Sequence, residues 1–196
     1  MDKDFRYHNV SYGGIHQLLT VEYWESRPRY DIRKCPGEAL PDFNHHYNEP
    51  VIKVEGMEDP KRIRIIFEDP LDVPWTIEVR ATGRSYISLG DLWNEIFKRL
   101  QQPVERSEWA LAMLSLPSTL RGHKKRSLNS LMKNRCQALQ AGRLLRVDWL
   151  HSSFGTYFVG LKKADNTADS MLLPGEQKCE YTFVAKFSSK SQTLKQ

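Results

Sequence analysis

Turn-forming residues divide the first third of the chain into short pieces, and this punctuation limits what the chain can fold into. The breaks are Gly13-Gly14, Pro28, Pro36-Gly37, Pro41, Pro50, Pro60 and Pro70. Proline fixes its own φ and pushes the preceding residue out of the helical region, so long helices are excluded here. Between the breaks, residues 51–54 and 62–67 are rich in Val and Ile, which is typical of strands.

Two elements in the middle of the chain have a clear period. Residues 75–80 alternate apolar and polar side chains, as a half-buried strand does. Residues 89–100 place apolar side chains three and four positions apart, which predicts an amphipathic helix. Ser88 and Asp91 have the spacing of a capping box, and Pro103 follows the helix. We therefore expect this helix to pack its apolar face on a sheet.

The second half of the chain predicts two further helices and three strands. We expect a helix from Ser107 to Leu114, a basic loop from Leu120 to Arg126, and a helix that begins at Ser127. The predicted strands span 144–150, 156–161 and 181–187. Strands on both sides of a helical region favour an α+β domain with a mainly antiparallel sheet and two to three helices packed on one face.

Length and composition agree with one globular domain. The chain has 196 residues, of which 40% are hydrophobic and 27% are charged. That is enough for one well-buried core and marginal for two. We predict a single domain over residues 30–187, a partly ordered extension over 1–29 and a polar tail over 188–196.

The sequence favours an intracellular protein that does not span a membrane. No stretch approaches about 18 consecutive apolar residues, and the first residues lack the apolar run of a secretory signal. Cys35, Cys136 and Cys179 lie far apart and form no C-x-x-C pair, so neither a disulfide framework nor a zinc knuckle is indicated. We expect three reduced thiols in a cytoplasmic or nuclear protein.

Positive charge gathers in one segment. The net charge is +5, yet no Asp or Glu occurs between Trp109 and Val147, where eight Lys and Arg residues stand. Such a segment attracts phosphates or acidic proteins, although basic runs more often form a solvated helical face. The candidate phosphate or partner contacts within this basic segment, 121–146, are Arg121, Lys124, Lys125 and Arg126.

Asp148 is the first acidic residue after the basic segment, on the strand predicted over residues 144–150. An inward-facing carboxylate there would need a cationic partner, and Arg135 or Arg143 is the natural candidate. A structural ion pair between Arg135 and Asp148 is therefore favoured over a catalytic carboxylate.

No motif predicts a catalytic residue, a bound cofactor or a metal. Gly13-Gly14 lacks the further glycines of a phosphate loop or a dinucleotide fingerprint. His45 and His46, with Asp42 nearby, resemble metal ligands, but adjacent side chains on an extended chain point to opposite faces. Cys136 has basic neighbours that would lower a thiol pKa, yet a small core residue is the more common role for such a cysteine.

Several segments, taken in order, resemble a family of uncharacterised fungal proteins known as domain of unknown function 6699. The segments are Tyr30-Asp31-Ile32, Trp75 to Val79, Ile87 to Ile96 with Leu100 and Pro103-Val104, Trp109, Arg135, Leu145 to Leu150 and Phe158 to Leu161. The resemblance covers about residues 30–161 and implies that these segments form one domain in a basidiomycete-type fungus. It supplies no activity and no catalytic residues.

These observations favour a non-enzymatic structural or protein-interaction module. The alternative is weak, sequence-indifferent binding to nucleic-acid phosphates through the basic segment. A second alternative is an enzyme whose site is assembled from scattered residues, which sequence reasoning cannot recognise. The partner is unidentified; an acidic protein or a nucleic acid fits the charge.

Overall fold

The structure, a computed structural model, describes residues 7–10, 13–25, 27–40, 43–54, 56, 58–67, 75–115, 117–139, 143–153, 155–163 and 179–190. The short elements before residue 54 are β1 (Tyr7–Val10), β2 (Gly13–His16), the 3-10 helix η1 (Gln17–Leu19), α1 (Val21–Glu25), α2 (Pro36–Ala39), α3 (Phe43–His46) and β3 (Ile52–Lys53). The remaining elements are β4 (Arg62–Phe67), β5 (Trp75–Arg80), α4 (Leu89–Leu100), α5 (Arg106–Ser115), α6 (Ser118–Leu139), α7 (Arg146–Ser153), β6 (Tyr157–Lys163) and β7 (Thr182–Ser188).

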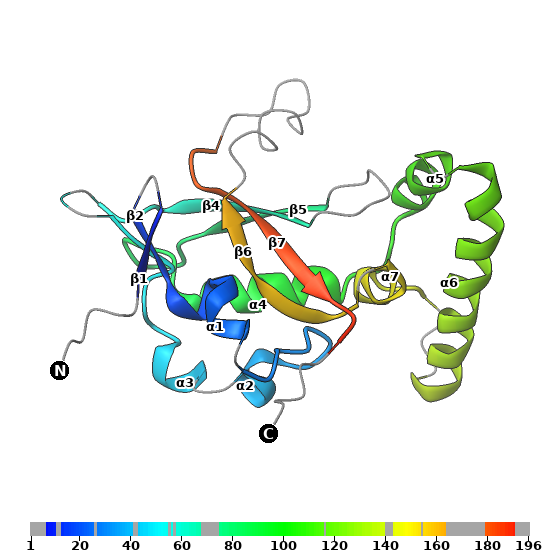
Figure 1. Cartoon of the computed structure of the whole chain (residues 1–196), viewed down its shortest axis with the longest axis horizontal. Coiled ribbons are helices and arrows are strands. Elements are labelled where there is room, and N and C mark those ends of the chain that lie inside the picture. Colours follow the sequence, from blue (N-terminus) through cyan, green and yellow to red (C-terminus); the bar gives the residue numbers. More distant parts are fainter. Residues whose placement is uncertain are drawn as a thin grey trace.

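Two sheets lie side by side in the fold (Figure 1). The smaller has the order β1-β2-β3 and is antiparallel. The larger has the order β5-β4-β7-β6, in which β4 pairs with β7 in parallel and the other pairs are antiparallel. The α+β class is confirmed, but the single, mainly antiparallel sheet is corrected to two sheets, one of them mixed. The described helices also exceed the predicted two to three, because short helices fill the gaps between the early turn formers.

Helix α4 confirms the strongest prediction from the sequence. The hydroxyl of Ser88 accepts the backbone N–H of Asp91 (3.1 Å), and the Asp91 carboxylate accepts the N–H of Ser88 (3.0 Å), which completes a capping box. The apolar stripe, including Leu92 and Ile96, is buried against β5 and the rest of the core. Because the apolar stripe of α4 packs on the sheet, this contact fixes the position of the helix.

Aromatic side chains connect α4 to the sheet and to the N-terminal segment. The ring of Trp93 meets the ring of Phe158 on β6 edge to face, with centroids 4.7 Å apart. The ring of Trp24 on α1 belongs to the same core cluster, and its centroid lies 6.1 Å from that of Phe158. Gly160 on β6 has no side chain, and the backbone of Val21 packs so close to it that a Cβ at this position would clash. Helices α1 and α4 therefore share one face of the larger sheet, and the core includes residues before position 30.

Helices α5 and α6 form an arm at one end of the molecule. Figure 1 shows α6 at the far edge, with α7 between it and the sheet. The predicted helix over 107–114 is confirmed as α5. The basic loop predicted over 120–126 is wrong, because those residues lie within the continuous helix α6. Lys and Arg are good helix formers, and no proline follows Pro117 in this stretch, so one glycine at position 122 does not interrupt the helix.

The strand predicted over residues 144–150 is also wrong, because Arg146–Ser153 form helix α7. A short apolar run does not distinguish a strand from a buried helical turn by periodicity alone. Here the Asp148 carboxylate accepts the backbone N–H of Leu145 (2.9 Å), which stabilises the start of a helix. Val147, Trp149 and Leu150 are then buried in the core.

In the described part of the chain, no helix combines the length and the apolar character needed to cross a bilayer.

Candidate functional site: an arginine-lined pocket

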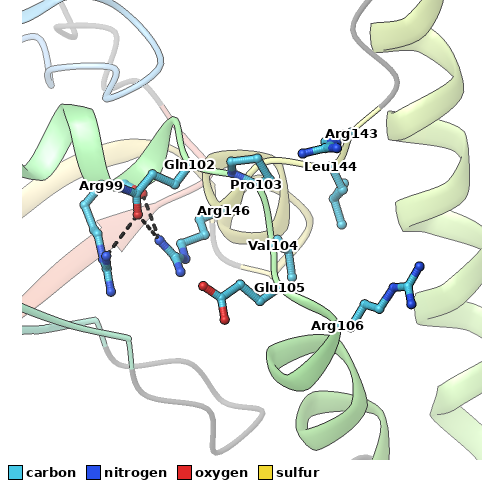
Figure 2. A pocket seen from close by; sticks show the side chains of 9 residues that line it. All are labelled: Arg99, Gln102, Pro103, Val104, Glu105, Arg106, Arg143, Leu144 and Arg146. Carbon is cyan, nitrogen blue, oxygen red and sulfur yellow. Dashed lines mark hydrogen bonds between the residues drawn. The ribbon is translucent and has the colours of Figure 1, made fainter.

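A pocket of about 810 Å³ lies where the arm meets the rest of the molecule. We call this region the junction and define it as residues 99–106 and 143–146, between the ends of α4, α5, α6 and α7. Figure 2 shows Arg99 on one side, Arg143 and Arg106 on the other, and Arg146 with Glu105 between them. The lining residues are Arg99, Gln102, Pro103, Val104, Glu105, Arg106, Arg143, Leu144 and Arg146.

Backbone pairing between two segments builds the pocket floor. Pro103 ends α4, because it cannot continue the helical hydrogen bonds, and the chain then runs extended to α5. Val104 donates its N–H to the carbonyl of Leu144 (2.9 Å), and Arg146 donates to the carbonyl of Gln102 (3.0 Å). Residues distant in the sequence are thus held side by side, and their arginines line the same pocket.

Arg146 is the structural centre of the pocket. It is only 2% exposed, and its guanidinium donates to Glu108 Oε1 from Nε (3.1 Å) and Nη2 (2.7 Å). Its Nη1 donates to the side-chain oxygen of Gln102. A buried guanidinium needs this number of acceptors, since an uncompensated buried charge is very unfavourable. Glu108 also accepts the backbone N–H of Glu105 (2.8 Å), so the same carboxylate caps α5 and holds Arg146.

The other three arginines keep charge available at the pocket. Arg99 donates to Gln102 (3.0 Å), a neutral acceptor. Arg106 and Arg143 are exposed, and neither has an ion-pair partner among the residues that the structure describes. Counted over the described side chains, the four guanidinium groups outnumber the two nearby carboxylates, Glu105 and Glu108, which gives the pocket an excess of positive charge. Guanidinium groups bind carboxylate and phosphate oxygens in pairs, which suits this pocket to an anionic group.

The residues predicted as phosphate or partner contacts lie outside this pocket. Arg121, Lys125 and Arg126 are exposed on α6, and Arg121 donates to the carbonyl of Leu114 (3.0 Å). Lys124 also lies on α6, but its side chain is outside the described residues. The structure therefore separates two basic features: the exposed face of α6 and the arginine pocket.

The ion pair predicted between Arg135 and Asp148 stays a prediction. The side chain of Arg135 lies outside the described residues, as does that of Cys136. Asp148 is on the first turn of α7, where one of its oxygens accepts the N–H of Leu145. This carboxylate therefore has a structural role whether or not Arg135 reaches it.

Sequence reasoning finds only part of the pocket. The basic segment predicted from the sequence includes Arg143 and Arg146 but neither Arg99 nor Arg106. The signal for these two arginines is their position on the two sides of Pro103, where a turn brings flanking side chains together. Only the pairing of residues 102–104 with 144–146 shows that they meet the basic segment.

A second polar cluster joins His16, His46 and Glu49. Nε2 of His16 lies 2.9 Å from Glu49 Oε2, and Nδ1 of His46 lies 3.1 Å from Glu49 Oε1. Nδ1 of the buried His16 accepts the N–H of Leu18 (3.2 Å), so a neutral ring carries its proton on Nε2 and donates it to Glu49. In metal-bound histidines the second ring nitrogen is instead a donor. The geometry is that of a hydrogen-bonded structural cluster.

From the sequence we expect His45 and His46 on an extended chain. That expectation is wrong, because both residues lie on the short helix α3. His46 turns inward to Glu49, while His45 is exposed. Asp42, which the sequence places beside them, is outside the described residues. Cys35 and Cys179 are free thiols, exposed and buried respectively.

Comparison with known proteins identifies a family but no activity. Residues 28–170 match the model of a family described as a family of unknown function, DUF6699. The match spans more than half of the chain, so the chain belongs to this family, as the resemblance in its sequence implied. No curated protein and no solved structure matches the chain.

Proposed function

We propose that this member of the DUF6699 family is a non-enzymatic interaction module that holds an anionic group of its partner in the arginine pocket. The observation that carries the proposal is that Arg99, Arg106, Arg143 and Arg146 line one pocket. Arg146 is neutralised and fixed by Glu108, which gives the pocket a rigid wall. Arg106 and Arg143 are exposed, and a bound anion satisfies them without displacing an internal partner.

Binding of sodium pyrophosphate tests this proposal. We expect pyrophosphate to bind in a calorimetric titration at low salt, and Arg106→Ala and Arg143→Ala to weaken the binding by about tenfold each, as loss of a charge-assisted pair does. Both side chains are exposed, so the variants should melt like the parent. Arg80→Ala removes an exposed arginine on β5 that does not line the pocket and should bind like the parent. Equal binding by all four proteins would refute a specific anion site.

Nucleic-acid binding by the arm is the second candidate function, and the exposed basic side chains of α6 favour it. Arg121 and Lys125 stand four residues apart, so they share one helical face, with Arg126 beside them. No Trp, Tyr or Phe interleaves with them in residues 121–126, which predicts phosphate contact without base stacking.

Salt dependence distinguishes this second candidate. If α6 binds phosphates, replacing Arg121, Lys125 and Arg126 together by Ala should flatten the plot of log affinity against log salt by about 0.7 to 0.9 for each phosphate that is no longer neutralised. The Arg143→Ala variant serves as the control, since its arginine lies outside this face. If the parent shows no binding to single- or double-stranded oligonucleotides at low salt, this candidate fails.

Three narrower expectations belong to the same proposal. The resemblance to fungal proteins supports a fungal source, and the three separated cysteines support an intracellular location. The boundaries at residues 30 and 187 also stay predictions; the core cluster runs from Ile15 to Ala185.

A further inference from the structure

An apolar groove lies directly beside the arginine pocket. It has a volume of about 290 Å³, and it shares Val104, Glu105, Arg106 and Leu144 with the pocket. Its lining is completed by Trp109, Leu128 and Asn129, from α5 and α6. Because the two hollows have a common wall, one ligand can occupy both.

The groove has fixed apolar walls. The ring of Trp109 meets the ring of Trp149 edge to face, with centroids 5.5 Å apart, so its orientation is set by the core. Leu128 of α6 is buried, with 1% of its surface exposed. With a volume of about 290 Å³, the groove has room for one large apolar side chain, which would displace several water molecules.

We propose that the junction binds an acidic peptide segment that carries one large apolar side chain. This inference rests on the proposed function and names the partner. The carboxylate or phosphate groups of the segment pair with Arg106 and Arg143, and the apolar side chain fills the groove between Trp109 and Leu128. Charge complementarity selects the acidic segment, and the groove selects the anchor.

A peptide is the occupant that matches this arrangement. Successive side chains of an extended peptide place an anion and an apolar group a few residues apart, as the pocket and the groove require. Arginine clusters recognise acidic and phosphorylated segments in this way, and a buried hydrophobic anchor supplies much of the affinity at such interfaces.

Fluorescence anisotropy with labelled peptides tests the inference on the full chain. The first peptide carries three glutamates and one leucine in a Gly-Ser background. In the second the leucine is replaced by serine, in the third the glutamates are replaced by glutamine, and in the fourth they are replaced by phosphoserine. We expect the first and fourth peptides to bind, and each of the other two to bind about tenfold more weakly. The fourth peptide shows whether phosphate or carboxylate is the better anion.

A matched pair of variants locates the anchor. Asn129→Trp, at an exposed position on the rim of the groove, should fill it and reduce binding of the first peptide to the level of the second. Ser130→Trp, the next residue on α6, is exposed and does not line the groove, so it should bind like the parent. Pyrophosphate binding should be unchanged in both variants, because the arginines remain.

The outcomes separate this inference from the proposed function. If both Glu peptides bind equally and Asn129→Trp has no effect, the anchor is wrong while the anion site stands. If neither pyrophosphate nor any peptide binds, the proposed function fails and this inference with it. If an oligonucleotide binds more tightly than the first peptide and Arg143→Ala weakens only the oligonucleotide, the partner is a nucleic acid and the inference is overturned.

Discussion

Helices α4 and α6 differ in how much of their surface packs against the core. Six of the twelve residues of α4 are buried, and its stripe lies on the core. Helix α6 is longer, with 22 residues, yet among its described side chains only Leu128 is buried. On α5, Leu111 and Leu114 are 59% and 69% exposed. The core is thus held by a continuous apolar surface, whereas the arm is held at its junction, where the pocket and the groove lie.

This comparison predicts that the largest loss of stability follows damage to α4. Ile96→Asp removes a buried apolar side chain and buries a charge, so it should lower the free energy of unfolding by about 4 kcal/mol or more. Asn94→Asp adds the same charge on the exposed side of the helix and should cost far less. Urea denaturation measures both. A parent-like Ile96→Asp variant would mean that the stripe is exposed and that the comparison is wrong.

An intermediate loss is expected where the arm is attached. Glu108→Ala leaves the guanidinium of Arg146 buried without its carboxylate and uncaps α5, which should cost about 3 kcal/mol. Glu105→Ala removes an exposed carboxylate from the same pocket and is the matched control. Thermal melting followed by circular dichroism measures the difference. Equal midpoints for the two variants would show that the Arg146 pair does not secure the arm.

The predicted pair of Arg135 and Asp148 gives a smaller effect: about 1 kcal/mol for Arg135→Ala, and about 2 kcal/mol for Asp148→Ala, which also removes the acceptor of the Leu145 N–H. If the two side chains are paired, the double variant should lose less stability than the sum of the single variants. Additive losses would remove the pair, while the bond from the N–H of Leu145 to Asp148 would remain.

The smallest expected effect is the dependence of stability on acidic pH through the buried carboxylate of Asp31. Burial alone would raise the pKa of Asp31, but hydrogen bonds from the side chain and backbone of Arg33 outweigh it and lower the pKa. The resulting stabilisation is present above the ordinary carboxyl pKa of about 3.9 and is lost as the pH falls through the lower folded-state pKa. Asp31→Asn should therefore destabilise the protein at neutral pH and have a flatter stability profile below about pH 4. Profiles of the same shape for both proteins would contradict this assignment.

The core is more predictable from the sequence than the arm, for a physical reason. In 75–80 and 89–100, one face is buried, so the apolar residues repeat with the period of the element. Among the described side chains of helix α6 only Leu128 is buried, and the basic residues over 121–126 resemble a loop in the sequence. In α7 the helix start is stabilised by the hydrogen bond from the N–H of Leu145 to the carboxylate of Asp148, three residues further on. The pattern of apolar residues does not reveal this bond.

The candidate site is the least predictable part, because it depends on contacts between distant residues. Arg99 and Arg106 meet Arg143 and Arg146 only through the pairing of Val104 with Leu144. Charge counting along the chain locates the second pair and favours α6 as the binding surface. It cannot show that the pocket lies at the base of the arm.

Hydrogen exchange with and without saturating pyrophosphate tests the central claim, that the junction is the binding site, most directly. We expect slower amide exchange in peptides covering residues 99–106 and 143–150 when pyrophosphate is present. Exchange in β4 and β5 should be unchanged, since both strands lie outside the pocket lining. No slowing at the junction, or slowing confined to residues 118–128 of α6, would contradict this claim.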